Sequence, residues 1–92
     1  MMTPDNSDGF ILWLFNSRCI GLDDPCYKFT REINEIEPRS SGGDAMDWKN
    51  RVTLCHEHHM EYHSNGTSEE AIQRLKSRRI EYLEVIGREQ YA

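Results

Sequence analysis

The chain lacks any long apolar stretch. Its longest run of apolar residues is FILWLF, at positions 10–15, and this is far shorter than the roughly 20 residues that an apolar helix needs to cross a bilayer. The first residues, MMTPDNSD, are acidic and lack the basic segment with which a secretory signal begins. We therefore expect no membrane contact and a location in the cytoplasm.

Cysteine is also scarce, and its number is odd. The three cysteines cannot all pair with one another, so a metal site in a reducing compartment explains them better than disulfides do. Positive charge is in the minority, because the formal net charge is −5. This balance disfavours a protein that holds nucleic acid by bulk electrostatic attraction, although a local cluster of basic residues can override it.

One such basic cluster is present in the C-terminal segment, and it consists of Arg74, Lys76, Arg78 and Arg79. On a helix these residues form either a solvated face that pairs with neighbouring glutamates or a contact with a DNA backbone.

At 92 residues, the chain predicts one domain over 1–92 whose small core needs reinforcement by a metal or a partner. Residues 1–9 are polar and predict a flexible start. The apolar residues in 10–19 favour a short strand or an apolar segment across the core, and the alternation over 27–37 predicts another strand. From position 48 to 63 the chain is expected to be helical or turn-like, and SNG at 64–66 is its expected stop.

The C-terminal helix is predicted over 67–87. The pair Thr67 and Glu70 forms a capping box at its start, and Gly87 is a suitable stop.

The most informative stretch is LCHEHHMEYH, at positions 54–63, which holds all four histidines and one cysteine. His59 and His63 are four residues apart, so a helix places both imidazoles on one face. Cys55 and His58 have the two-residue gap of a zinc knuckle. Because residues 58 and 59 point about 100° apart on a helix, two metal sites are more natural than one.

The first predicted site is a structural Zn²⁺ held by Cys19, Cys26, Cys55 and His58. The gap between Cys19 and Cys26 is wider than the usual two to four intervening residues. Either the knuckle has a longer loop, or one of these cysteines is only a core residue. The second site is a working ion on His59 and His63 with a further ligand. The alternative to both is a polar helix with surface histidines and buried free cysteines.

The run EINEIEPRSSGGDAMDWKNRVTLCHEHHMEYH resembles the HNH endonuclease family, particularly the small zinc-ribbon HNH proteins of bacteriophages. PRSSGG stands at 38–43, Asn50 falls at the family's asparagine position, and LCHEHH with His63 matches the last block, with His58 replacing a cysteine. The match covers residues 19–63. It implies an α+β fold of the ββα-metal type, in which two short strands joined by the PRSSGG loop are followed by a helix, with one divalent ion between them. The zinc knuckle and the C-terminal helix predicted above complete this fold.

The resemblance also implies roles for individual residues. Asn34, His59 and His63 would hold one divalent ion, which is Mg²⁺, Mn²⁺, Ni²⁺ or Zn²⁺. Glu35 would act as the general base. Asn50 would orient the strand that carries the base, and Arg39 would contact a phosphate of the DNA.

The chain departs from the family pattern at the two positions before I-x-P, where the family has a metal ligand and then a base histidine. Asn34 is a neutral and weaker oxygen donor. Glu35 is a poorer base than histidine near neutral pH, unless burial strengthens its affinity for a proton. It could instead become a ligand of the working ion.

Three functions follow as alternatives. The first is a phage-encoded DNA endonuclease or nickase that acts in the cytoplasm of the bacterial host cell. The second is a catalytically lapsed HNH module that binds a protein or a nucleic acid, such as a phage regulator or an inhibitor of a host nuclease. The third is a plain zinc-ribbon structural subunit.

Overall fold

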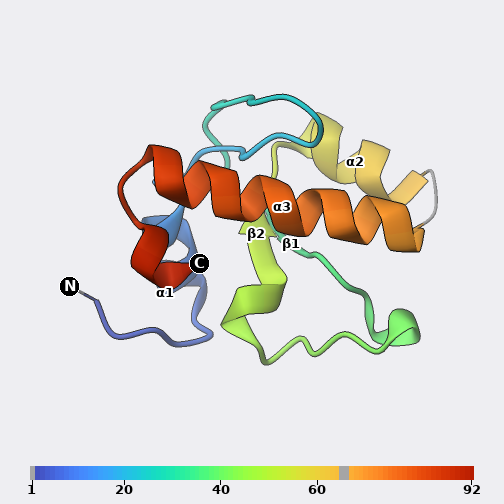
Figure 1. The fold of residues 1–92 in the computed structure, drawn as a ribbon, viewed down its shortest axis with the longest axis horizontal. Helices are drawn as coiled ribbons and strands as arrows, with labels where there is room; N and C mark the ends of the chain where they lie inside the picture. The colour runs from blue at the N-terminus through green and yellow to red at the C-terminus, as the bar shows by residue number, and fades with distance from the viewer. Residues whose placement is uncertain (1, 65–66) are drawn as a thin grey trace.

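The computed structural model describes residues 2–64 and 67–92. In this part of the chain three α-helices, α1 (Asp8–Leu14), α2 (His56–Ser64) and α3 (Glu69–Val85), accompany a two-stranded antiparallel sheet of β1 (Ile33–Glu35) and β2 (Arg51–Thr53). The long α3 runs past the sheet and α2 (Figure 1). The predicted α+β class is confirmed, and the sequence order of two strands followed by a helix is present in β1, β2 and α2.

The apolar segment that begins at Phe10 forms a helix, so the predicted short strand is wrong. The Ser7 side chain caps α1 by accepting a hydrogen bond from the Phe10 amide at 3.1 Å. Phe10, Ile11 and Leu14 are buried, which agrees with the alternative of an apolar segment laid across the core. The predicted flexible start covers 1–9, but Asp8 and Gly9 belong to α1, and Met1 lies outside the described residues.

The sheet is shorter than expected and pairs Ile33 with Thr53, Asn34 with Val52 and Glu35 with Arg51. Of the strand predicted over 27–37 only three residues pair in the sheet, and Phe29 makes a single bridge to Arg18. The segment from Trp48 is not continuously helical. It forms a short 3-10 turn, η2 (Trp48–Asn50), then β2, and only then α2. The predicted stop of this helix extends over Asn65 and Gly66, which lie outside the described residues.

The helix α3 begins one residue later than the predicted capping box. Ser68 is the N-cap, and its hydroxyl accepts a hydrogen bond from the Ala71 amide at 3.1 Å. The predicted stop at Gly87 is confirmed, because Gly87 follows the C-cap Ile86 with a φ of 76°, a conformation that glycine adopts without strain.

Two of the four basic residues of the C-terminal segment are buried, which corrects the expectation of an exposed basic face. The Arg78 Nε donates to the Ile20 carbonyl at 2.6 Å. Arg79 donates to the Tyr91 carbonyl at 3.2 Å and lies 5.6 Å from the Trp48 ring centroid. Burial lowers the pKa of the Arg79 guanidinium to about 10. These two arginines therefore join distant segments of the chain, and their guanidinium groups are not available to contact DNA phosphates.

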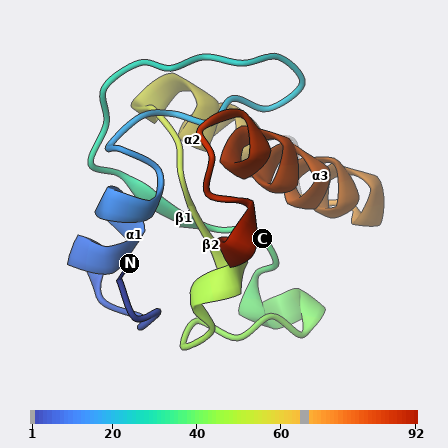
Figure 2. The ribbon, with the colours of Figure 1, turned by 60° about the vertical axis from the view of Figure 1, so that its left-hand side comes forward.

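The core lies between α1, the sheet and α3 (Figure 2). Tyr82 donates from its hydroxyl to the Phe15 carbonyl at 2.6 Å. An aromatic cluster at one end joins α1, η2 and the C-terminal turn, with ring centroids 5.5 to 6.3 Å apart; its members are Phe10, Trp13, Trp48 and Tyr91. Among the described residues, no helix combines the length and apolar character that a bilayer crossing requires.

Candidate metal centre

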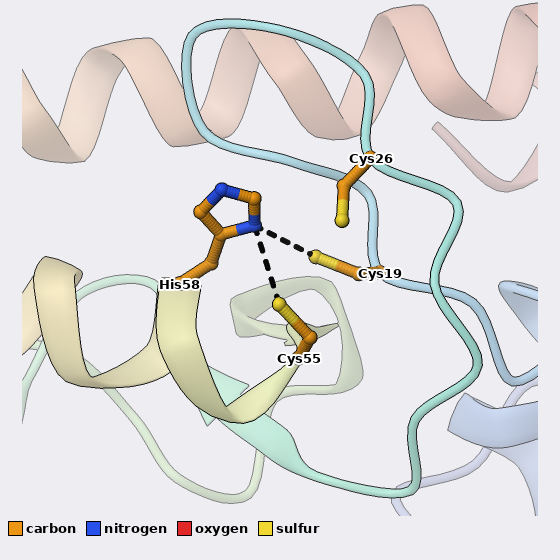
Figure 3. Close-up of side chains that lie close together, drawn as sticks. All are labelled: Cys19, Cys26, Cys55 and His58. Carbon is orange, nitrogen blue, oxygen red and sulfur yellow. Dashed lines mark hydrogen bonds between the residues drawn. The ribbon is translucent and has the colours of Figure 1, made fainter.

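Four side chains from distant parts of the chain meet at one point: Cys19, Cys26, Cys55 and His58. Their ligand atoms all lie within 4.8 Å of one another. His58 Nδ1 lies 3.3 Å from Cys19 Sγ and 3.4 Å from Cys55 Sγ (Figure 3). Neighbouring ligands of a tetrahedral zinc ion lie about 3.6–3.8 Å apart. The predicted quartet therefore has the residue types and the spacing to hold a metal ion such as zinc.

The loop over 19–26, here called the knuckle loop, is longer than the loop of a usual zinc knuckle. Backbone hydrogen bonds nevertheless hold its two ends together. The Cys19 amide donates to the Lys28 carbonyl at 2.7 Å, and the Tyr27 amide donates to the Cys19 carbonyl at 2.9 Å. A Cβ at Gly21 would lie 1.9 Å from the Asp24 carbonyl oxygen, so the loop requires glycine there. Because Cys26 joins the other three ligands, the structure favours the longer loop over the alternative of a cysteine that serves only the core.

The other two ligands are positioned by the start of α2. Cys55 directly precedes the helix, and its carbonyl accepts a hydrogen bond from the His59 amide at 2.8 Å. His58 is three residues after Cys55, which on a helix places the two side chains one above the other. The knuckle loop and the start of α2 thus supply two ligands each (Figure 3).

The chemistry of the quartet suits a cation. Burial raises the pKa of the Cys19 thiol to about 12, so a bare thiolate is unfavourable at this position. A thiolate becomes favourable when a metal ion stands beside it, because zinc binds the deprotonated form. Four such ligands and no open position are typical of a structural zinc site.

The second pair of histidines turns toward β1. The ring centroids of His59 and His63 are 4.9 Å apart, and His63 Nε2 lies 2.7 Å from Asn34 Oδ1. Asn34 is only 2% exposed. Adjacent ligands of an ion with bonds of about 2.1 Å lie about 3 Å apart. The three predicted ligands of the working ion are therefore neighbours, but only the Cys19 quartet forms a group of three or more His, Cys, Asp or Glu ligands in the described ranges.

A carboxylate that the sequence pattern did not indicate lies beside two of the histidines. Glu32 Oε1 lies 3.0 Å from His56 Nδ1, and Glu32 Oε2 lies 3.1 Å from His59 Nδ1. Nδ1 of His59 is thereby engaged, which leaves Nε2 for a ligand. Glu32 is one of 16 acidic residues and lies 27 positions before His59. No short sequence spacing connects the two residues, so the sequence pattern alone could not have indicated Glu32.

The remaining predicted residues differ in how the structure holds them. The Asn50 side chain accepts a hydrogen bond from the Glu37 amide at 2.9 Å and donates to the Glu37 carbonyl at 3.0 Å. It thus holds the backbone two residues beyond Glu35. Glu35 is half-buried and has no hydrogen bond or ion pair with His59 or His63, and Arg39 is exposed at the start of a 3-10 turn, η1 (Arg39–Ser41). The catalytic roles of these residues stay predictions.

No known protein family, curated protein or solved structure matches the chain. The resemblance to HNH endonucleases therefore depends on the motif residues alone. The geometry itself supports a more general description than the resemblance does. The chain is a small α+β protein with a Cys/His cluster that could hold a metal ion.

Proposed function

We propose that the chain is a metal-dependent DNA endonuclease or nickase whose working site is mounted on a zinc-stapled scaffold. The observation that carries this proposal is the convergence of Asn34 from β1 with His59 and His63 from α2. These are the three residues that the HNH-like motif assigns to a divalent ion. The zinc quartet includes His58, which directly precedes His59, so a zinc ion there would fix the first turn of α2.

The residues around this pair of histidines fit a cation. Two imidazoles on one helix face, an amide oxygen and a nearby carboxylate are all donors that divalent first-row metals accept. A bound divalent ion would supply electrostatic stabilisation of the scissile phosphate and of the leaving 3′ oxygen. The contact with Glu32 would hold His59 in the orientation that presents Nε2.

The protein's own part in the reaction is proton transfer and positioning. Glu35 would take a proton from the attacking water, whose oxygen bonds to phosphorus while the bond from phosphorus to the 3′ oxygen breaks. Asn50 supports this role by holding the backbone at Glu37, where the segment that carries Glu35 leaves the sheet. Arg39 would bind a flanking phosphate with its guanidinium.

The test is a plasmid nicking assay of the zinc-loaded chain with added Mg²⁺, Mn²⁺, Ni²⁺ or Zn²⁺. His59→Ala should lower the nicking rate by more than roughly 100-fold, because it removes a ligand of the working ion. The matched control is Met60→Ala, which truncates an exposed side chain of the same helix, next to His59, that the motif does not assign to an ion. Nicking by the wild type that His59→Ala leaves unchanged would contradict the proposed site.

A second function is favoured by one observation. In the described part of the chain no hydrogen bond or ion pair joins Glu35 to a histidine, whereas Asn34 and Glu32 each lie at hydrogen-bond distance from one. A catalytically lapsed module that binds DNA or a phage or host protein would have this arrangement, with the ligands in place and the base missing. Glu35→His distinguishes the two functions. If the wild type never nicks and Glu35→His does, the native chain is a binding module.

A further inference from the structure

An aromatic side chain stands exposed on the knuckle side of the molecule between two arginines. Phe29 is 61% exposed, and a backbone bridge joins it to Arg18. The Cζ atoms of Arg18 and Arg31 lie 6.0 Å and 5.9 Å from its ring centroid. We refer to Arg18, Phe29 and Arg31 as the Phe29 surface.

The two guanidinium groups are only loosely associated with the ring. In the same molecule the guanidinium of Arg88 lies 4.0 Å from the Trp13 ring centroid, which is the distance of close stacking. At about 6 Å a cation–π contact is at the limit of its range. The Phe29 ring therefore keeps most of its surface open, and both exposed arginines can turn toward another group.

The arginines of this surface also lack acidic partners. Neither Arg18 nor Arg31 takes part in an ion pair within residues 2–64 and 67–92, whereas the neighbouring Lys28 pairs with Glu57 at 3.2 Å. In a chain of net charge −5, the Phe29 surface is thus a local positive patch with an apolar ring at its centre.

We propose that the Phe29 surface binds an unpaired segment of a DNA strand, with a base stacked on Phe29 and phosphates on Arg18 and Arg31. Stacking on an exposed aromatic ring and contacts with flanking cations are the two means by which proteins hold single strands. An acidic peptide would satisfy the arginines but has no flat base to cover the ring. The charge and the ring together favour a nucleic acid.

The Phe29 surface lies close in the chain to the candidate working site, and this inference rests on the proposed nuclease function. Arg31 directly precedes Glu32, whose carboxylate contacts His59. From Phe29 to Asn34 the chain spans at most about 17 Å, which corresponds to about five stacked nucleotides of one strand. A strand held at Phe29 would therefore reach the candidate working site within a few nucleotides of the stacked base.

The experiment measures fluorescence anisotropy of a labelled oligothymidine with the zinc-loaded full chain and no added divalent ion, so that cleavage does not interfere. Phe29→Ala should weaken binding by roughly 5- to 100-fold, because it removes the stacking platform. Arg18→Gln combined with Arg31→Gln should weaken binding and reduce the salt dependence by about 1.4 in the log–log slope. Arg74→Gln, an exposed arginine of α3, is the matched control and should bind as the wild type does.

Several results would overturn the inference. These are no binding by the wild type, equal binding by Phe29→Ala, and equal weakening by Arg74→Gln. Binding of a polyglutamate peptide that depends on the two arginines but not on Phe29 would assign the surface to an acidic protein instead.

Nicking assays separate this inference from the proposed function. If the wild type binds oligothymidine but never nicks, the Phe29 surface is supported and the nuclease function is contradicted. If the wild type nicks, does not bind oligothymidine, and nicks equally well after Phe29→Ala, the nuclease function is supported and the Phe29 surface is contradicted.

Discussion

Two glutamates three residues apart have different surroundings in this molecule. Glu32 has one carboxylate oxygen near His56 and the other near His59. Glu35 has neither contact and lies on β1 opposite Arg51 in the sheet register. A carboxylate that holds an imidazole in place acts through that imidazole, whereas a free carboxylate can accept a proton itself. We therefore expect Glu32 to position His59 and Glu35 to serve as the base.

Substitution of each glutamate by glutamine separates these roles. Glu35→Gln keeps the shape of the side chain but removes its proton affinity, so the nicking rate should fall by roughly 10²- to 10⁴-fold at every concentration of the added ion. Glu32→Gln should instead weaken ion affinity by roughly 10- to 100-fold, because the orientation of His59 is less well held. Nicking rates measured over a series of ion concentrations distinguish a lower maximum from a shifted midpoint.

The glutamate prediction has a clear counter-result. If Glu35→Gln nicks as fast as the wild type when the ion is limiting, Glu35 is neither a base nor a ligand. A fall in maximum rate with Glu32→Gln alone would transfer the role of base to Glu32.

Individual residues could be predicted from the sequence where the residue type is rare and its chemistry narrow. Three cysteines and a histidine of the HEHH run have few uses besides a metal site, and the structure brings Cys19, Cys26, Cys55 and His58 together. Glutamate and arginine have many uses. The contact of Glu32 with His59 and the burial of Arg78 depend on packing between distant segments, which residue type does not encode.

At the scale of single elements, α3 is the helix that holds the knuckle loop in place. Its buried Arg78 donates to the Ile20 carbonyl, one residue after the candidate zinc ligand Cys19. Its Tyr82 donates to the Phe15 carbonyl near the end of α1. The stability of α3 therefore bears on both the core and the candidate zinc site.

The N-cap of α3 can be tested by a single substitution. Ser68→Ala removes the hydroxyl that accepts from the Ala71 amide, which should cost about 1 kcal/mol of the free energy of unfolding. For a domain of this size that cost lowers the melting temperature by about 4–8 °C. Thermal unfolding followed by far-ultraviolet circular dichroism is the measurement.

Thr67→Ala is the control for this prediction. It should change the melting temperature less than Ser68→Ala, because Ser68 and not Thr67 is the cap in the structure. The reverse order would mean that the capping box expected from the sequence is the one in use.

Elements were predictable where polar residues mark their ends and periodicity marks their faces. The C-terminal helix has both, and its start is displaced only from Thr67 to the cap at Ser68. The segment FILWL is apolar on every side, so its periodicity does not separate a buried helix from a buried strand. Its helical form depends on the Ser7 cap and on burial against the sheet, and the second of these is a property of the whole fold.

At the scale of the whole molecule, the candidate zinc site joins the knuckle loop to the start of α2 through four side chains. In a domain this small, binding energy at such a site is also folding energy. We expect about one tightly held zinc ion per chain, and Cys55→Ser should lose the zinc and the folded structure together. Elemental analysis with circular dichroism on the same samples is the measurement.

The matched control for zinc binding is His56→Ala, which changes a histidine next to the quartet without removing a ligand and should keep the zinc. A well-folded, fully reduced wild-type sample that contains no zinc would show that the quartet is not a structural metal site.

The aromatic cluster gives the molecule a localised optical signal. Both tryptophans of the chain, Trp13 and Trp48, pack against Tyr91 in that cluster. The cluster contains none of the four cysteine and histidine ligands, so the intrinsic fluorescence of the chain reports on the end formed by α1, η2 and the C-terminal turn. Emission that stays constant while a chelator removes zinc would identify local opening of the knuckle. Emission that changes in step with zinc loss would show that the two ends of the molecule unfold as one cooperative unit.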